Sequence, residues 1–237
     1  MELSVVLPTY NERDNILLLI ERLDAALAGV GHEILVVDDD SPDGTAARVE
    51  TYAAGHPTVR VIRRVGVRGL VTAIREGIAQ SRGDAVAWMD ADLSMPPELV
   101  AALYAALPRA DVALGSRYVA GGSDGRDNVP VHRLFSGALN AALRLLLGAG
   151  VTDYTSGFLC VKRSVLQAIP LTGDYGEYCI EFLHRARRRG FRIVELPYRN
   201  AARVHGESKT AAGVGGLLRR GWRYVWLALR MRAVVGR

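Results

Sequence analysis

The feature that most constrains the fold is a regular alternation of short apolar runs with helix-like segments along the first half of the chain. The apolar runs, typical of buried strands, cover residues 3–7, 33–37, 59–62, 85–89 and 111–114. Between them lie segments with helical spacing at residues 11–28, 42–54 and 69–81, and a further helix that Pro96 and Pro97 are expected to open. Strands and helices that alternate in this way predict a mostly parallel sheet covered by helices on both faces.

Polar clusters follow three of these predicted strands. They are the segment PTYNE at residues 8–12, the three consecutive carboxylates Asp38 to Asp40, and the segment Asp-Ala-Asp at residues 90–92. Because ligands bind beyond the carboxyl ends of the strands in such sheets, we expect these clusters to meet in one crevice. Adjacent like charges repel one another, so the acidic clusters indicate a site that supplies partners for them.

The carboxylates suit two kinds of contact. Asp90 and Asp92 are spaced to share Mg²⁺ or Mn²⁺, which take oxygen ligands, and the small Ala91 leaves room for a diphosphate. Such pairs also occur as solvated turns. Asp38 and Asp39 are placed to accept hydrogen bonds from a base or a ribose hydroxyl, whereas Asp43 is expected to cap the next helix.

The second half of the chain is less regular. Residues 121–130 read as a turn-rich loop, which we expect to act as a lid, and helices are predicted at 132–147 and 175–190. Strands are predicted within 153–163 and 191–198. No glycine-rich phosphate loop follows the first strand, which disfavours a dinucleotide-dependent dehydrogenase and a P-loop kinase.

Six segments carry a resemblance to a known family. VVLPTYNERDNI, VVDDDSPDGT, MDADLSMPPE, GSRY, TSGF and RVHGESK occur in this order up to about residue 209. In this combination the chain resembles the family 2 glycosyltransferases of the α/β GT-A fold, and most closely their polyprenol (dolichol) phosphate mannose synthases. The resemblance implies inverting transfer of mannose from GDP-mannose to a polyprenyl monophosphate, with Mg²⁺ or Mn²⁺.

The resemblance also implies a division of the chain. A catalytic domain would cover residues 1–210, with a nucleotide-sugar half at 1–116 and an acceptor half at 117–210. A basic amphipathic helix would occupy residues 211–237.

The resemblance assigns residues to three kinds of contact. Contacts with the nucleotide sugar fall to Pro8, Tyr10, Glu12, Val37, Asp39, Asp90, Ala91, Asp92 and Lys209. The acceptor phosphate falls to Arg117, Arg133, Ser136 and Arg203, and the metal to Asp90 and Asp92, with Ser94 standing where some relatives have a glutamine ligand. Asp92, Arg117 and Arg203 are the expected catalytic residues. The attacking phosphate oxygen is already anionic, so no general base is required. Arg144 and the arginines of residues 185–189 are expected to serve solvation or structural ion pairs.

Two alternatives remain open at this point. One is a polyprenyl-phosphate glucosyltransferase that uses a UDP-sugar, since an acidic nucleotide pocket does not separate guanine from uracil. The other is a non-catalytic nucleic-acid-binding protein, suggested by the net charge of +5. It is disfavoured because no aromatic and basic reading surface is evident, and we expect no nucleic acid as a partner.

The end of the chain predicts contact with a membrane surface. No apolar run approaches the ~20 residues of a membrane span, and Cys160 and Cys179 lack metal or redox spacing, which suggests a reducing, cytoplasmic setting. A helix at 216–235 would gather one apolar side, formed by Leu218, Trp222, Val225, Trp226 and Leu229. Its flanks and back would carry Arg219, Arg220, Arg223 and Arg230.

This pattern is typical of a helix that lies in the membrane interface. We therefore expect peripheral association with the cytoplasmic face of a membrane. The alternative is that Trp222 and Trp226 pack on the domain or on another subunit. Whether a separate membrane-anchoring partner is needed stays open.

Overall fold

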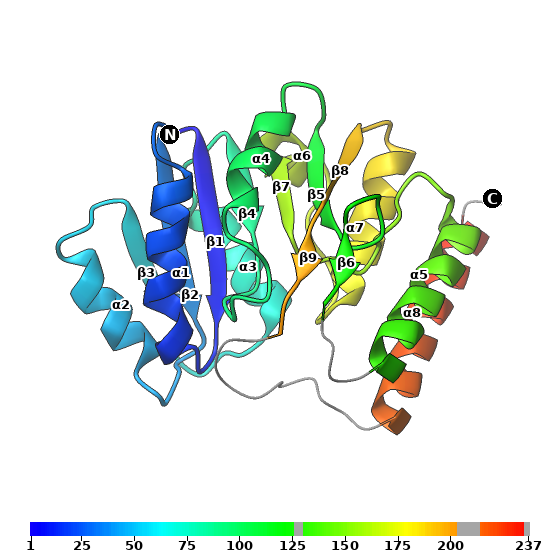
Figure 1. Ribbon diagram of the computed structural model, residues 1–237, viewed down its shortest axis with the longest axis horizontal. Coiled ribbons are helices and arrows are strands. Elements are labelled where there is room, and N and C mark those ends of the chain that lie inside the picture. The colour runs from blue at the N-terminus through cyan, green and yellow to red at the C-terminus, as the bar shows by residue number, and fades with distance from the viewer. Residues whose placement is uncertain (126–129, 203–213, 235–237) are drawn as a thin grey trace.

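The computed structural model describes residues 1–125, 130–202 and 214–234, and its centre is a seven-stranded sheet in the order β3-β2-β1-β4-β7-β5-β8 (Figure 1). The strands are β1 (Leu3–Thr9), β2 (His32–Asp38), β3 (Val59–Arg63), β4 (Ala85–Trp88), β5 (Val112–Ser116), β7 (Leu159–Lys162) and β8 (Ile193–Pro197). A second, two-stranded sheet pairs β6 (Ser123–Asp124) with β9 (Arg199–Asn200).

Strand direction confirms the expected mostly parallel sheet. β1 pairs in parallel with β2 and β4, β2 with β3, and β5 with β8. Only β7, among the strands of this sheet, is antiparallel to both of its neighbours, β4 and β5. The other six strands therefore end at one edge of the sheet, which we call the rim, and β7 begins there.

Helices cover both faces of the sheet. Their bounds are α1 (Arg13–Ala26), α2 (Thr45–Ala53), α3 (Leu70–Gln80), α4 (Leu99–Ala106), α5 (Pro130–Leu147), α6 (Arg163–Ala168), α7 (Glu177–Arg188) and α8 (Val214–Val234). Residues of α1, α2 and α4 pack in one apolar cluster, and residues of α3, α5, α6, α7 and α8 pack in the other. α5 and α8 lie side by side at the end of the molecule farthest from α2 (Figure 1).

The apolar spacing of α1 explains how such a helix is held. Ile16, Leu19, Ile20 and Leu23 recur at intervals of three and four residues, and none has exposed surface. They pack with the strand residues of one face of the sheet. Each fully buried side chain of this kind contributes about 1.5–3 kcal/mol, so the stripe rather than helix propensity stabilises α1.

Some expected boundaries were wrong. β1 was expected to end before Pro8, but it continues to Thr9 along β2. Its pairing with β4, on the other side, stops at Val6, so the missing N–H of Pro8 interrupts no hydrogen bond to β4. α4 begins at Leu99 rather than at Pro96. The carbonyl groups of Pro96 and Pro97 accept hydrogen bonds from the N–H groups of Leu99 and Val100, which form a turn that leads into the helix. Neither α6 nor the small β6–β9 sheet was predicted. The sheet includes part of the expected 121–130 lid, and residues 126–129 of that lid lie outside the described residues.

Helix α8 packs on the domain through one side only. Ala228 has no exposed surface, and Tyr224 and Met231 pack against the buried cluster. Trp222 is 67% exposed, Trp226 50% and Leu229 44%. The alternative that the two tryptophans pack on their own domain is therefore wrong. Among the described residues no helix combines the length and apolar character that crossing a membrane requires.

Candidate functional site

The rim carries the unusual backbone conformations of the molecule. Within the described residues, the non-glycine positions with positive φ are Asn11 at 56°, Asp40 at 55° and Leu93 at 61°. They follow β1, β2 and β4, three neighbouring strands. Such a conformation costs about 1–3 kcal/mol per residue, and such residues cluster at functional sites. The strain therefore coincides with the polar clusters that the sequence pointed to.

Asp38, the first of the three consecutive aspartates, is structural. It has no exposed surface, and its carboxylate accepts hydrogen bonds from Thr9 Oγ1 at 2.8 Å and from the Ser41 N–H at 2.8 Å. These bonds join the ends of β1 and β2. Asp38 is thus engaged within the fold and offers no open edge to a ligand.

Asp39 and Asp40 are each paired with an arginine. Asp39 accepts from Arg64 Nε at 2.7 Å and from the Gly69 N–H at 2.8 Å, and Asp40 accepts from Arg63 Nε at 2.7 Å. The Asp39–Arg64 pair is almost fully buried. Partners of opposite charge thus offset the repulsion between the adjacent carboxylates, and Asp39 also fixes the loop that leads into α3.

Asp43 holds the first turns of two helices. Its carboxylate accepts from the N–H of Thr45, the first residue of α2, at 2.9 Å and from the N–H of Arg13, the first residue of α1, at 3.0 Å. Gly44 is the N-cap residue of α2 and makes no side-chain cap. The expected capping role of Asp43 is therefore extended to α1.

The predicted nucleotide residues differ in how open they are. Pro8 and Tyr10 are partly exposed at the rim, and the guanidinium of Arg68 lies 4.2 Å from the centre of the Tyr10 ring. Glu12 is mostly buried, and its carboxylate accepts from Asn15 Nδ2 at 2.9 Å. Val37 has no exposed surface and packs in the core, so its side chain offers nothing to a ligand in this state.

The Asp-Ala-Asp turn after β4 is compact. Asp92 is 3% exposed and accepts from the N–H of Ser94 at 3.0 Å, and Ala91 is also buried. The carbonyl group of Ser94 accepts from the N–H of Ala201 at 2.8 Å. This bond brings the chain after β9 against the turn. Arg203 and Lys209, two predicted phosphate contacts, lie outside the described residues.

The two carboxylates fit a divalent cation that is shared with a substrate. In the described part of the chain, no three His, Cys, Asp or Glu side chains are grouped to hold a metal by themselves. Asp90 and Asp92 supply two carboxylates, and the remaining oxygen ligands would come from a diphosphate and water. Mg²⁺ and Mn²⁺ take this kind of donor set at nucleotide sites.

Arg117, directly after β5, forms the most buried ion pair of this region. Its Nε and Nη2 atoms donate to the two carboxylate oxygens of Asp153, both at 2.8 Å, and Nη2 also donates to Thr155 Oγ1 at 2.8 Å. Asp124 lies 3.8 Å from Nη1. Burial alone would lower the pKa of Arg117, but the Asp153 carboxylate outweighs it and raises that pKa. Arg117 therefore remains a cation.

A hydrogen-bond network joins Arg117 to α5. Asn140 Nδ2 donates to Thr155 Oγ1 at 2.9 Å and to the carbonyl group of Ser136 at 3.1 Å. The hydroxyl of Tyr118 donates to Ser136 Oγ at 2.9 Å. Two predicted acceptor residues, Arg117 and Ser136, are thus brought into one network. Arg133 lies in α5, and its side chain is outside the described part of the structure.

The Asp-Ala-Asp turn and Arg117 lie at neighbouring points of the rim. Leu159, the first residue of β7, pairs with Trp88 at the end of β4 and with Leu114 near the end of β5. Asp90 follows β4 by two residues, and Arg117 follows β5 directly. The two groups therefore flank the start of β7 at the same edge of the sheet.

Several residues of this network were not predicted. Asp153, Thr155, Asn140 and Asp124 orient Arg117 or connect it to α5, whereas Arg64 pairs with Asp39 and Arg68 lies over Tyr10. The available signal was the segment DYTSGF, which places a carboxylate and hydroxyl groups just before the strand β7.

Comparisons with known proteins show which family the chain is similar to. Residues 4–169 match the model of the glycosyl transferase family 2. The polyprenol monophosphomannose synthase of Mycolicibacterium smegmatis is 42% identical over 86% of this chain and 79% of its own length. The undecaprenyl-phosphate mannosyltransferase of Micrococcus luteus is 36% identical over 98% of this chain and 99% of its own.

A third relative is longer. The dolichol-phosphate mannosyltransferase of Pyrococcus furiosus is 38% identical over 88% of this chain, which spans 59% of that protein's length. Among solved structures, glucosyl-3-phosphoglycerate synthase from Mycobacterium tuberculosis, in complex with Mn²⁺, UDP and glucosyl-3-phosphoglycerate, has a TM-score of 0.70. It is 26% identical, over 98% of this chain and 79% of that one.

Proposed function

The chain belongs to glycosyl transferase family 2, and from this premise we propose that it transfers mannose from GDP-mannose to a polyprenyl monophosphate. The observation that carries the proposal is that the buried Arg117–Asp153 pair and the Asp-Ala-Asp turn flank the start of β7 at one edge of the sheet. A fixed cation beside a metal-type carboxylate pair suits the meeting of two anionic substrates. The names of three relatives, all mannosyltransferases or mannose synthases acting with prenyl phosphates, support this choice of sugar and acceptor.

In the proposed reaction, an oxygen of the lipid phosphate attacks the anomeric carbon of mannose. The bond from that carbon to the diphosphate breaks, GDP leaves, and the configuration inverts. Asp90 and Asp92 would hold Mg²⁺ or Mn²⁺, which when bound supplies positive charge to the leaving diphosphate. Tyr10, Glu12 and Asp39 are proposed to contact the nucleotide, and Arg117, with Ser136, the acceptor phosphate.

Residues outside the described part complete the proposal. Arg133 and Arg203 would bind the acceptor phosphate, and Lys209 the donor diphosphate. Each would contribute charge-assisted hydrogen bonds of about 1.5–3 kcal/mol. Their positions in the sequence suit this, since Arg133 precedes Ser136 by less than one helical turn and Arg203 follows Ala201, whose N–H contacts Ser94.

We further propose that α5 and α8 form a surface that rests on a membrane. Leu134, Ala138, Ala141 and Leu145 are all exposed, and their spacing of four, three and four residues puts them on one side of α5. Phe135 of α5 lies against Gly221 of α8, where an added Cβ would come within 2.4 Å of its ring. The two helices therefore run side by side, and each carries exposed apolar side chains.

The charges of these helices support the same partner. Neither α5 nor α8 contains an acidic residue. Arg144, Arg223 and Arg230 are exposed on them, and each basic residue near an anionic leaflet contributes about 1 kcal/mol. Since the proposed acceptor is a membrane lipid, we place the enzyme at the cytoplasmic face, where a nucleotide sugar is available.

A donor panel tests the proposed function. The thermal unfolding of the full chain would be followed with Mn²⁺ and GDP-mannose, UDP-glucose or UDP-galactose, and transfer to polyprenyl phosphate would be measured for each donor. We expect stabilisation and transfer with GDP-mannose. Transfer with UDP-glucose alone would instead support a polyprenyl-phosphate glucosyltransferase, for which the UDP-bound structural neighbour argues. No transfer with any donor would contradict the proposal.

A further inference from the structure

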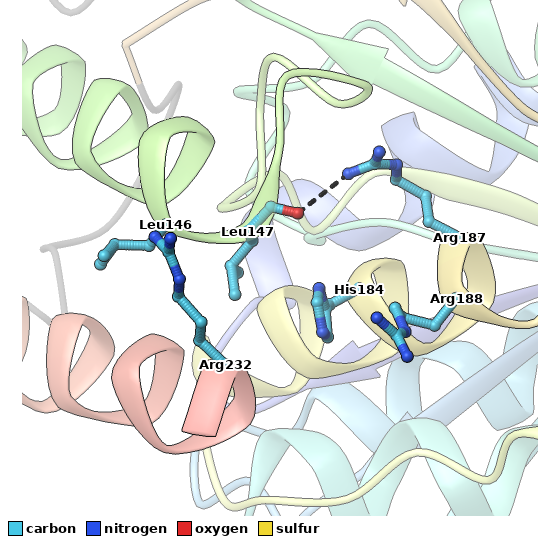
Figure 2. A pocket seen from close by; sticks show the side chains of 6 residues that line it. All are labelled: Leu146, Leu147, His184, Arg187, Arg188 and Arg232. Atoms are coloured by element: carbon cyan, nitrogen blue, oxygen red, sulfur yellow. Dashed lines mark hydrogen bonds between the residues drawn. The ribbon is translucent and has the colours of Figure 1, made fainter. Parts of the chain in front are cut away.

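A basic hollow lies between the last turns of α5, α7 and α8 (Figure 2). Its volume is about 280 Å³, close to the lower end of the range for small-molecule sites. Its walls are formed by Leu146, Leu147, His184, Arg187, Arg188 and Arg232. None of these residues belongs to the site described above.

The hollow is well separated from that site. Ser136 lies in the first turns of α5 and joins the Arg117 network, whereas Leu147 is the last residue of the helix. With a rise of about 1.5 Å per residue, the two ends are about 16 Å apart along the helix axis. A ligand in the hollow would therefore not share the catalytic contacts.

Arg187 is fixed in the wall of the hollow. Its Nη1 atom donates to the carbonyl group of Leu147 at 3.1 Å and to the hydroxyl of Tyr154 at 3.1 Å. An added Cβ at Gly150 would lie 2.6 Å from its Nε, so the glycine leaves the room that the side chain occupies. The guanidinium group is thus held in place before any ligand binds.

The other charges of the hollow are not balanced within the fold. The six wall residues include three arginines and no carboxylate. The nearest arginine along α7, Arg185, pairs with Glu181 at 3.3 Å, but Arg188 and Arg232 have no ion-pair partner among the residues that the structure describes. Like charges brought together in this way repel one another unless an anion lies between them.

His184 completes the wall. It is 9% exposed, and its Nδ1 has no hydrogen-bond partner in the described structure. Burial, followed by the charges of Arg188 and Arg187, lowers its pKa. A ring with an unused nitrogen therefore lies beside Arg187 and Arg188, and an anion bound there would offset the part of the lowering of its pKa that these two charges cause.

We propose that this hollow is a second anion site, which binds a phosphoryl group. The planar fork of arginine matches the oxygen geometry of phosphate, and Arg188 and Arg232, from two helices, can each donate to a phosphoryl anion beside the fixed positive charge of Arg187. Leu146 and Leu147 supply an apolar wall for whatever carbon chain is attached to it. The phosphoryl group could belong to a lipid headgroup or to a free phosphate, and the proposal depends on neither the sugar nor the acceptor of the transfer reaction.

Phosphate binding to the full chain tests this inference. The full chain would be titrated with inorganic phosphate in the absence of metal and nucleotide. Calorimetry would measure binding, and NMR would follow the signals of the His184 ring, which are assigned by their loss in the variant His184→Gln. We expect saturable binding that moves the His184 signals. The double variant Arg188→Ala/Arg232→Ala should weaken binding at least tenfold, and the matched variant Arg75→Ala/Arg82→Ala, which removes two exposed arginines of α3 and the following turn, should not.

A second arm separates the two sources of the phosphoryl group. A short-chain phosphatidylglycerol below its micelle concentration would be compared with inorganic phosphate in the same assay. Binding at least tenfold tighter would assign the site to a lipid headgroup, and equal binding to a free phosphate. His184 signals that do not move, or phosphate binding by the Arg188→Ala/Arg232→Ala variant that equals that of the wild type, would overturn the proposal. The transfer activity of this variant on a dispersed acceptor should equal that of the wild type.

Discussion

Arg117 and Asp153 face each other with two hydrogen bonds of 2.8 Å, although they are 36 residues apart in the chain. The pair is buried, with side-chain exposures of 9% and 0%. It uses the Nε and Nη2 atoms of the guanidinium group and leaves Nη1 nearest to Asp124. Arg117 is therefore presented in one fixed orientation rather than as a flexible surface cation.

Arg117→Ala should lose at least tenfold in kcat/KM, because a charge-assisted hydrogen bond to phosphate is worth about 1.5–3 kcal/mol. Its free energy of unfolding should also be about 3–5 kcal/mol lower than that of the wild type, because Asp153 is left buried without its partner. Steady-state kinetics and urea unfolding would measure the two effects.

The double variant Arg117→Ala/Asp153→Ala separates stability from catalysis. With no unpaired charge left in the interior, we expect it to recover part of the lost stability and none of the lost activity. If the double variant regained near wild-type kinetics, Arg117 would have no place in the proposed site.

Asp92→Ala should abolish transfer, because Asp92 is one of only two carboxylates that the turn after β4 offers to a cation. Exhaustive chelation with EDTA should do the same, and added Mg²⁺ or Mn²⁺ should restore the wild type only. Asp14→Ala, at an exposed position in the first turn of α1, is the matched control. Full turnover after chelation would argue against a metal.

Stability at low pH should depend on Glu33. Burial would raise its pKa, but hydrogen bonds from Ser4, the Arg82 N–H and Arg60 together lower it below the ordinary 4.5. A lowered pKa in the folded state means that the contribution of Glu33 is fully present above pH 4.5 and is lost as the pH falls through the lower value. The unfolded chain takes up the proton first.

Glu33→Gln should therefore be less stable than the wild type near neutral pH. On acidification below pH 4.5 it should lose less stability than the wild type loses. Urea unfolding at a series of pH values would measure both. Glu50→Gln, at an exposed position of α2, controls for the loss of one negative charge. Parallel curves for Glu33→Gln and the wild type would contradict the linkage.

Binding to anionic vesicles should depend on the outer faces of α5 and α8. The double variant Leu145→Ser/Trp226→Ser removes two exposed apolar side chains, each worth up to roughly 1.5–3 kcal/mol on burial, and should reduce binding at least tenfold. Co-sedimentation with vesicles would measure it. Leu18→Ser, at a 45% exposed leucine of α1, should bind like the wild type. If both variants lost vesicle binding equally, the outer faces of α5 and α8 would not be the membrane-binding surface.

The sequence by itself determined the class of fold and the edge of the sheet at which the polar clusters gather. Apolar periodicity identifies strands and helices because burial acts on each element locally, and the polar residues that follow β1, β2 and β4 mark the rim because parallel strands end at one edge. The positions of Asp39, Asp90 and Asp92 on that rim follow from this reasoning.

Only the tertiary structure decided which partner each charged group has. Nothing in DDD distinguishes Asp38, which is buried between two strand ends, from Asp39, which binds Arg64. The meeting of Arg117 with Asp153 requires β7 to run antiparallel between β4 and β5, because only that direction brings the segment before β7 to the rim. Local spacing does not encode the direction of a strand inserted from a distant part of the chain, since its neighbours are chosen by packing over the whole sheet.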